Sequence, residues 1–375
     1  MRAFEFQVRE AEKPKVGRAL QHAEDLVIVD GSAGAMRALD SLAAMADNVG
    51  DVTIKWDGSP AVYFGRNEQG QFILTDKSGF VAKGYDGKVT SPADLEKMLL
   101  SRGKTEPDES RKRFAASMAG IWDKFESIVD PKFRGYVFGD LLYQSTPQKD
   151  KNGDWTFTPN TVTYHIPEDS DLGKRIGNTV AGIVVHQYVS LDGQEQPIKG
   201  PIKGINTQGP VLVVGPTTVT EAPSIDTAQL DSARAFVKSN AKLIDTLLDD
   251  AKLAANKMTD FKAILYKFVN QQVKTRDLTN LDSRFEQWLG TSGVSAPKQA
   301  KIAELRQTQP KAFAAVFNTL EMIMKIKDNI IDQLDVTSPV KASIAGQRGG
   351  EGYVKGDIKL VPRTKFTAAN VEKHA

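Results

Sequence analysis

The stretch Val52-Thr53-Ile54-Lys55-Trp56-Asp57-Gly58-Ser59 decides how this chain is interpreted. Val52, Thr53 and Ile54 are β-branched and favour a strand, whereas Asp-Gly is typical of a turn. Lys55 is therefore expected where a strand runs into a turn. Because Lys-x-Asp-Gly also arises by chance, the stretch alone indicates only a strand end. The rest of the chain has to show whether Lys55 has a chemical role.

The composition is typical of a globular protein. The 375 residues are 40% hydrophobic and 26% charged, enough for one large or two ordinary domains. The formal net charge is only +2, so a site for a polyanion must be a local patch. With no cysteine and only 4 histidines, the chain has no disulfides and is not expected to bind zinc.

No targeting or membrane segment is apparent. Residues 1–15 are charged and lack the apolar stretch of a signal peptide. No apolar run approaches the roughly 20 residues that cross a bilayer. We therefore expect a cytoplasmic protein without a membrane partner, located in the host cytoplasm if the source is a virus.

The hydrophobic pattern divides the chain into three parts. Residues 1–220 mix short β-rich runs with turns, residues 221–340 are helical, and residues 341–375 return to strands. In the first part we expect helices at 33–46 and 110–128. Strands are expected there at 51–54, 61–64, 72–75, 135–138, 156–158, 161–166, 182–188 and 211–214.

The middle part reads as a helical bundle inserted into the first fold. Its apolar residues recur at helical spacing, and Pro297 and Pro310 mark helix boundaries. Because strands resume after the bundle, we expect the last strands to pair with the first ones. The predicted fold class is α+β.

Four further charged residues lie in or beside predicted strands. We expect Lys77 at a hairpin turn, Asp140 directly after an apolar strand, and Glu351 at a strand start. Lys359 lies inside the apolar run Ile358-Lys359-Leu360-Val361. Either Asp140 faces solvent or it is functional, since an unpaired buried carboxylate is costly. Lys359 is equally consistent with the solvent face of an edge strand.

In this order the motifs resemble those of the covalent nucleotidyltransferases, which include ATP-dependent DNA and RNA ligases and mRNA capping enzymes. Glu351-Gly352-Tyr353-Val354 matches the family's Glu-Gly-x-Val motif well. The other similar segments are Lys55-Trp56-Asp57-Gly58-Ser59, Thr75-Asp76-Lys77-Ser78-Gly79, Phe138-Gly139-Asp140 and Ile358-Lys359. The resemblance implies a ligase-type domain of antiparallel sheets with flanking helices, of which 1–220 and 341–375 form the core.

The chain also resembles an uncharacterised family of proteins from tailed phages. That resemblance includes His22-Ala23-Glu24-Asp25-Leu26, Gly139-Asp140-Leu141-Leu142 and Gly349-Gly350-Glu351-Gly352. It leaves out the helical insert. It implies no particular reaction.

The nucleotidyltransferase resemblance implies a role for each matched residue. Lys55 attacks ATP and carries AMP as a lysyl-AMP intermediate, and Asp57 positions it. Glu351 orients Lys55 or binds Mg²⁺ (or Mn²⁺), with Asp140 as a second carboxylate for the metal, and Lys359 contacts the α-phosphate. Lys77 and Lys355 bind the nucleotide, and Asp140 accepts from the ribose. Either His186 or Tyr188 stacks on adenine.

Four departures limit the resemblance. Pro60 replaces a ribose-contacting Arg or Asn, Lys77 replaces an Arg, and Asp357 replaces a lysine that Lys355 lies near. The chain ends too soon after Lys359 for the OB-fold of DNA ligases. An RNA-ligase-like enzyme acting on nucleic-acid ends or nicks is therefore favoured over a DNA ligase. A basic groove beside Lys55 is expected, with candidates Lys83, Lys88, Lys174, Arg175, Arg363 and Lys365.

Two other functions stay open. The chain is alternatively a non-catalytic virion or assembly protein of a phage that retains the nucleotidyltransferase fold. A third possibility is transfer of AMP to a protein or a small molecule. The helical insert offers a surface for nucleic acid or for a protein partner.

Overall fold

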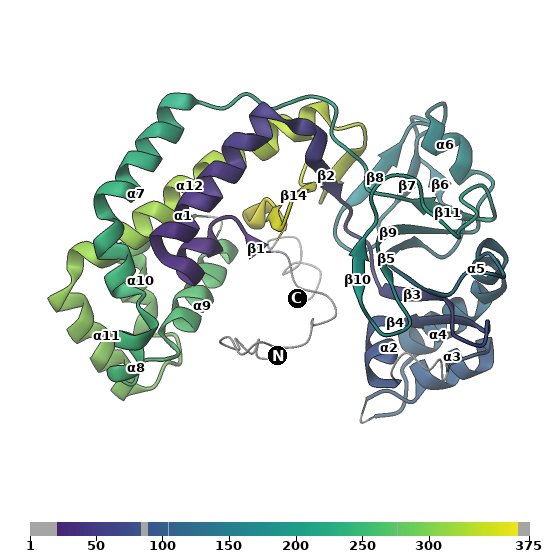
Figure 1. The fold of residues 1–375 in the computed structure, drawn as a ribbon, viewed down its shortest axis with the longest axis horizontal. Helices are drawn as coiled ribbons and strands as arrows, with labels where there is room; N and C mark the ends of the chain where they lie inside the picture. The colour runs from purple at the N-terminus through teal and green to yellow at the C-terminus, as the bar shows by residue number, and fades with distance from the viewer. Residues whose placement is uncertain (1–20, 84–88, 104, 276, 367–375) are drawn as a thin grey trace.

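A computed structural model describes residues 21–83, 89–103, 105–275 and 277–366 of the chain. It confirms the α+β class, with three mainly antiparallel sheets and two groups of helices. One helical group lies on the left of Figure 1, and the other covers the sheets on the right. Strand β2 (Val52–Lys55), which ends at Lys55, lies between these two parts in Figure 1.

The first sheet brings the beginning and the end of the described chain together, and we call it the Lys55 sheet. Its strand order is β1 (Gln21–His22), β15 (Ile358–Leu360), β14 (Gly352–Lys355) and β2 (Val52–Lys55). β14 is antiparallel to β2, with Gly352 opposite Lys55. The expected pairing of the last strands with the first ones is therefore confirmed.

The second sheet, which we call the cleft sheet, contains most of the strands expected in the first part. Its order is β10 (Glu195–Pro197), β9 (Ala181–Val189), β5 (Gly135–Tyr143), β3 (Ala61–Arg66) and β4 (Phe72–Asp76), with β11 (Val211–Val214) also paired to β9. The third sheet has the order β13 (Gln347–Arg348), β12 (Lys341–Ile344), β8 (Thr163–Ile166), β7 (Trp155–Phe157) and β6 (Gln148–Lys149).

The helices form a large group and a smaller one. The large group is α1 (Asp25–Asp47), α7 (Thr227–Leu247), α8 (Asp250–Ala255), α9 (Phe261–Lys274), α10 (Leu281–Leu289), α11 (Ala296–Thr308) and α12 (Pro310–Thr337). The others are α2 (Lys77–Lys83), α3 (Pro92–Leu100), α4 (Glu109–Gly120), α5 (Trp122–Ile128), α6 (Asp171–Ile176) and the short 3₁₀ turn Val49–Asp51. Pro297 and Pro310 lie in the first turns of α11 and α12, as expected.

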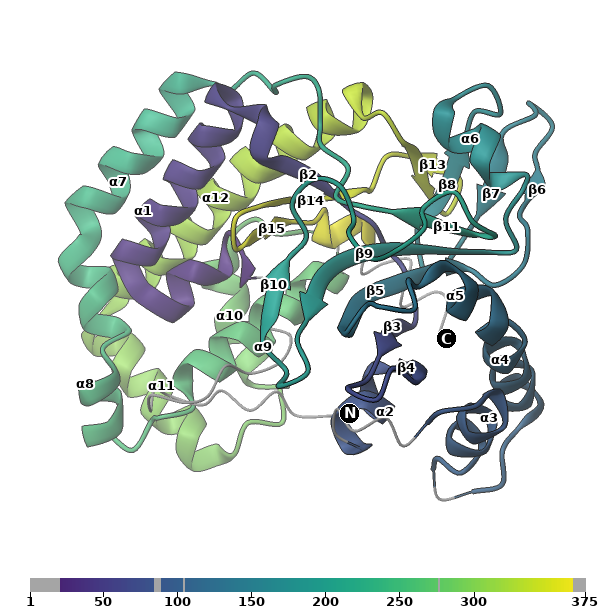
Figure 2. The same cartoon turned by 45° about the vertical axis from the view of Figure 1, so that its right-hand side comes forward.

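One hydrophobic core runs through the helical part and under the Lys55 sheet. α1 packs beside α7 and α12 (Figure 2), and Val52 and Ile54 of β2 belong to the same buried cluster as the helices. The helices of residues 221–340 therefore share a core with α1 and do not enclose one of their own. A second core lies between the cleft sheet and α3, α4 and α5. The boundaries at 220 and 340 stay a prediction.

Both helices predicted in the first part differ from the observed ones. The helix expected at 33–46 begins at Asp25, because the chain continues helically through a break at Asp30 and Gly31, where Gly31 has φ of 61°. The helix expected at 110–128 is divided between Gly120 and Trp122. This break turns Trp122 and Phe125 onto the sheet, where they make edge contacts with Phe72 and Phe64.

Two of the charged residues lie in elements that the sequence did not predict for them. Lys77 is the first residue of α2 and does not lie at a hairpin turn. The cause is Asp76, whose side chain accepts a hydrogen bond of 2.9 Å from the Gly79 amide and so caps the helix. Asp140 does not follow a strand but lies inside β5, between Ala61 of β3 and Val184 of β9.

Candidate functional site

Lys55 and Lys359 share one face of the Lys55 sheet. Along β2, Val52 and Ile54 are buried in the core, so Thr53 and Lys55 point to the opposite face. Along β15, Ile358 and Leu360 enter the same core, which puts Lys359 on the face of Lys55. Neither lysine makes a hydrogen bond or an ion pair with any residue that the structure describes. Burial and then the charge of Lys55 lower the pKa of Lys359.

Gly352 leaves room beside Lys55. The two residues are cross-strand partners, and a Cβ atom on residue 352 would lie 3.3 Å from the Cβ of Lys55. A side chain at this position would therefore crowd the base of the lysine. This close approach explains why the second residue of the Glu-Gly motif is a glycine.

Glu351 lies buried directly before that glycine. Its side chain accepts a hydrogen bond of 3.1 Å from the Tyr164 hydroxyl, and its second oxygen, Oε2, has no partner among the described residues. Burial raises the pKa of Glu351 well above its usual value, which the Tyr164 hydrogen bond only partly offsets. Since nearby Asp335 and Asp57 raise this pKa further, the protonated form of the carboxyl group is favoured.

Asp57 fixes the end of β2 to a neighbouring turn. Its carboxylate accepts hydrogen bonds from the Asn160 side chain (3.0 Å), the Thr161 amide (2.7 Å) and the Val162 amide (3.0 Å). Its own amide donates to the Tyr164 hydroxyl at 2.5 Å. Asp57 thus positions Lys55 through the backbone, since its carboxylate is bound to the turn.

A small cavity lies over Lys55 and Lys359. Its volume is about 190 Å³, and it is also lined by His22, Asn270, Arg363 and Phe366. Arg363 donates to Glu24 (3.0 Å), Asp25 (2.9 Å) and the Asn270 side chain (2.5 Å). Although burial alone would lower the pKa of Arg363, Asp25 and Glu24 raise it. A fixed, permanently charged guanidinium therefore forms one wall of the small cavity.

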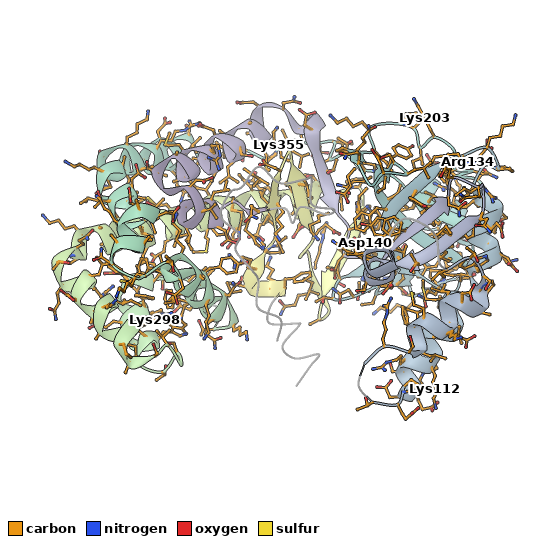
Figure 3. All side chains as sticks on the ribbon, turned by 60° about the horizontal axis from the view of Figure 1, so that its bottom comes forward. Lys112, Arg134, Asp140, Lys203, Lys298 and Lys355 are labelled. Carbon is orange, nitrogen blue, oxygen red and sulfur yellow. The ribbon has the colours of Figure 1, made fainter. Side chains whose placement is uncertain are left out.

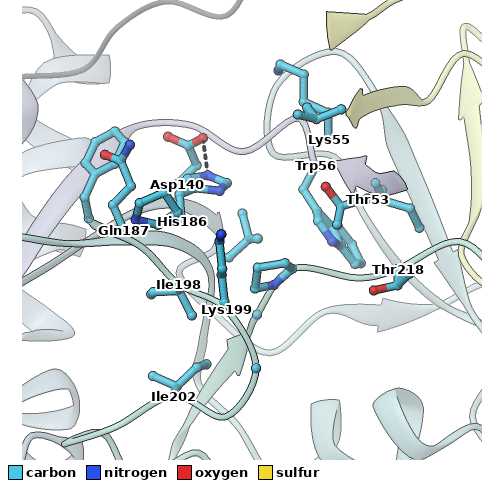
Figure 4. Close-up of a pocket in the computed structure, with 18 of the residues that line it drawn as sticks. Thr53, Lys55, Trp56, Asp140, His186, Gln187, Ile198, Lys199, Ile202 and Thr218 are labelled. Atoms are coloured by element: carbon cyan, nitrogen blue, oxygen red, sulfur yellow. Dashed lines mark hydrogen bonds and ion pairs between the residues drawn. The ribbon is translucent and has the colours of Figure 1, made fainter. Parts of the chain in front are cut away.

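A much larger cleft lies between the Lys55 sheet and the cleft sheet. Its volume is about 1530 Å³. In Figure 4, Asp140, His186 and Gln187 lie on one side, and Thr53, Lys55, Trp56 and Thr218 lie on the other. His186 is 3.0 Å from Asp140 between Nε2 and Oδ2, and Lys77 lies 5.6 Å from the centre of the Phe138 ring. Lys55 borders both this large cleft and the small cavity.

The structure brings together most of the predicted site residues, in two groups. Lys55, Lys77, Asp140, His186 and Lys355 line the large cleft, whereas Lys55, Asp57 and Lys359 line the small cavity. Glu351 lines neither hollow.

Lys355 has other partners than a phosphate. It donates from Nζ to the backbone oxygens of Ala44 (2.7 Å) and Asn48 (2.8 Å), at the C-terminal end of α1. The lysine thereby satisfies carbonyl groups that a helix end leaves open. Its position in the large cleft is thus a consequence of holding α1.

The predicted metal-binding carboxylates do not meet in one site. Asp140 lines the large cleft and contacts His186, while Glu351 lies buried beside Tyr164. Among the described residues, no group of three or more His, Asp or Glu side chains could hold a metal ion. Mg²⁺ often uses only one or two carboxylates together with substrate phosphates, so Asp140 in the large cleft could supply such a ligand, whereas Glu351 lines neither hollow.

The expected basic groove is only partly present. Arg175 lines the large cleft and Arg363 the small cavity, whereas exposed Lys174 lines neither and Lys365 pairs with Asp332 on the surface. Lys88 and the side chain of Lys83 lie outside the described residues.

The sequence interpretation missed several residues of the site. Tyr164 joins Asp57 to Glu351, Phe138 lies under Lys77, and Lys199 projects into the large cleft (Figure 4). Alternation along β5 could have placed Phe138 on the face of Asp140. No local signal marks Tyr164, because its partners are far from it in sequence.

A family model matches residues 18–374, nearly the whole chain, and its description is a family of unknown function, DUF6267. No curated protein and no solved structure shows a significant match to the chain. Within the described residues, none of the helices has both the length and the apolar character needed to span a membrane.

Proposed function

The chain belongs to the DUF6267 family, whose function is unknown, and we propose that it is an ATP-dependent nucleotidyltransferase that carries AMP on Lys55. The main support for this proposal is the pair Lys55 and Lys359. The two lysines share one face of the sheet beside the small cavity and have no partner among the described residues. Cations left without carboxylates are expected where an anionic ligand supplies the opposite charge. The pairing of β2 with β14 also supports a ligase-type domain.

The proposed step joins AMP to the lysine. The unprotonated Nζ of Lys55 attacks the α-phosphorus of ATP, an N–P bond forms, and the bond from the α-phosphorus to the bridging oxygen breaks. Pyrophosphate leaves, and the proton lost from Lys55 is taken by a base. The leaving pyrophosphate or solvent can act as that base, while Glu351 supports the strand opposite Lys55 through its hydrogen bond with Tyr164. Lys359 stabilises the charge that develops on the phosphate.

The large cleft offers the remaining contacts for the nucleotide. Asp140 accepts from the ribose hydroxyls, and Phe138 and His186 provide a surface for adenine, since their ring centres lie 6.0 Å apart. ATP would bring Mg²⁺ or Mn²⁺ on its phosphates, and Asp140, which lines the large cleft, would contribute a ligand to the ion, which would neutralise phosphate charge.

Nucleic-acid ends or nicks are the proposed acceptors, with RNA favoured over DNA. At about 1530 Å³ the large cleft exceeds the roughly 300–1000 Å³ of a typical small-molecule site. The excess volume suits a polynucleotide end beside the nucleotide. Cations on its wall, among them Lys77, Arg175 and Lys199, would meet the backbone phosphates.

Labelling with ATP tests the proposal directly. We expect protein incubated with ATP labelled at the α-phosphate and Mg²⁺ to retain the label after denaturation, and Lys55→Ala to lose it. Lys112→Ala is the matched control, because Lys112 is an exposed lysine at the periphery of the molecule (Figure 3), paired only with Glu109. Absence of label with every nucleoside triphosphate would contradict the proposal and favour the non-catalytic alternative.

The acceptor is identified by a second assay. We expect labelled protein to seal nicked RNA faster than nicked DNA or single-stranded ends. Labelled protein that seals none of them, but passes AMP to a protein or small molecule, would contradict the nucleic-acid part alone.

A further inference from the structure

We infer that the small cavity binds the diphosphate end of the nucleotide, and that pyrophosphate leaves through it, while the nucleoside lies in the large cleft. This inference rests on the proposed function and adds a second binding site to it. The site consists of Lys359, Arg363 and His22, of which only Lys359 has a role in the adenylation step proposed above.

The size of the small cavity favours a phosphate group over a nucleoside. Its volume of about 190 Å³ is below the roughly 300–1000 Å³ of sites that enclose whole small molecules. The wall includes Lys55 and Lys359, which have no partner among the described residues, and a guanidinium. Asp57 also lines the cavity, but three donors already bind its carboxylate. The remaining polar surface is therefore mainly cationic.

Arg363 is held in a fixed position and still has donors to offer. Its Nη1 donates to Glu24 and Asp25, and its Nη2 donates once, to Asn270. A guanidinium has five N–H groups, so the Nε group and one Nη2 group stay without a partner among the described residues. Fixed fork geometry of this kind suits phosphate oxygens.

His22 adds a further unused polar atom. It lies opposite Lys359 in the pairing of β1 with β15, and its Nδ1 is buried without a partner among the described residues. Burial lowers the pKa of His22 well below its usual value, so the ring is neutral at pH 7 and donates from one nitrogen. A buried polar atom without a partner is rare in proteins, and a phosphate oxygen would satisfy Nδ1 in the tautomer that carries the proton on this nitrogen.

The position of Lys55 connects the two hollows. In phosphoryl and nucleotidyl transfer the leaving group departs roughly in line with the attacking atom. Lys55 borders both hollows, so an α-phosphate at its Nζ lies where they meet. The nucleoside fits only the large cleft, and the diphosphate then extends into the small cavity.

Binding of inorganic pyrophosphate in the presence of Mg²⁺, measured by calorimetry, tests the inference. We expect Lys359→Gln to weaken binding at least tenfold and Lys112→Gln to leave it unchanged. His22→Leu should weaken binding about fivefold, and His22→Gln, which keeps a side-chain donor, should weaken it less. The circular dichroism spectrum of each variant shows whether it folds. Binding that survives Lys359→Gln and His22→Leu but is lost in Lys199→Gln would overturn the inference, because Lys199 lines only the large cleft.

The exchange of labelled pyrophosphate into ATP separates the inference from the proposed function. If the protein is labelled by ATP but the KM for pyrophosphate is the same in wild type and His22→Leu, the function stands and the cavity assignment fails. If ATP gives no label while pyrophosphate still binds through His22 and Lys359, the diphosphate site stands and the adenylation proposal fails.

Discussion

Tyr164 and Asp57 show how single residues hold the candidate nucleophile. One hydroxyl contacts both the Asp57 amide and Glu351, so the end of β2 and the start of β14 share a hydrogen-bonded support. The support lies beneath Lys55 and does not touch its ammonium group. A substitution in it is therefore expected to change folding stability as well as chemistry.

Removal of the Asp57 carboxylate tests this support. Asp57→Ala leaves the amides of Thr161 and Val162 without their acceptor, and Asp57 is only 8% exposed. We expect the free energy of unfolding in urea to fall by about 2–4 kcal/mol. Within the part of the chain that the structure describes, the carboxylate of exposed Asp94 accepts a single hydrogen bond, from the Ser91 hydroxyl, so Asp94→Ala is the control and should cost less than about 1 kcal/mol. Equal losses in the two variants would contradict the structural role of Asp57.

The sequence indicated which residues are candidates for the site, but not which residues they contact. Lys55, Asp140, Glu351 and Lys359 could be singled out because a charge in or beside a predicted apolar strand is conspicuous. Their neighbours in the site, Tyr164, His22 and Arg363, could not be identified from the sequence, because only the folded chain brings them close. Asp57 illustrates the difference, because its motif was visible but its three hydrogen-bond donors belong to the turn at 160–162.

Among the secondary-structure elements, α1 depends on the Lys55 sheet at its C-terminal end. No basic residue lies in its last turn, and the positive charge comes from Lys355 of β14. The partial negative charge of a helix C-terminus favours such a cation. The helix and the sheet therefore stabilise each other.

Replacement of Lys355 by methionine tests this contact. The variant loses the hydrogen bonds to Ala44 and Asn48 and the charge at the helix end, but keeps an apolar chain of similar length. We expect the free energy of unfolding to fall by about 1–2 kcal/mol, and Lys112→Met, which removes an exposed ion pair, to change it by under about 0.5 kcal/mol. No difference between the two variants would show that the contact does not stabilise α1.

Strand positions were predicted closely from the sequence, whereas helix ends were less predictable. The strands at 52–55, 61–66 and 211–214 lie where β-branched runs placed them. The start of α2 was missed because Asp76 caps it in the middle of a segment that resembled a hairpin. The break between α4 and α5 was missed because the apolar spacing continues across it, and only packing on the sheet requires it.

Across the whole molecule, a buried ionic cluster joins the helical part to the site. Lys327 of α12 is 2.8 Å from Glu24, and both side chains are at most 1% exposed. Burial alone would raise the pKa of Glu24, but Lys327 and Arg363 hold it well below its usual value. The cluster thus fixes Arg363 relative to α12. The position of this wall of the small cavity therefore depends on how the helices pack.

Removal of one charge from the cluster should lower the free energy of unfolding more than removal of two opposite charges together. Lys327→Met leaves Glu24 buried beside one cation fewer, and we expect the free energy of unfolding in urea to fall by about 3–5 kcal/mol. The double variant Lys327→Met with Glu24→Gln removes both charges and should recover part of this loss. If the losses of the two single variants simply add in the double variant, the charges are not coupled as the structure indicates.

The pairing of β2 with β14 has a consequence for synthesis of the protein. Lys55 is translated well before Gly352, Lys359 and Arg363, because the helices of residues 221–340 lie between them in the sequence. On the ribosome, the candidate nucleophile therefore leaves the exit tunnel long before the strands that form its sheet, and β2 waits as an unpaired edge. A nascent chain released before residue 352 would contain the lysine but not its site. The candidate site is thus complete only after residues through Arg363 have been translated.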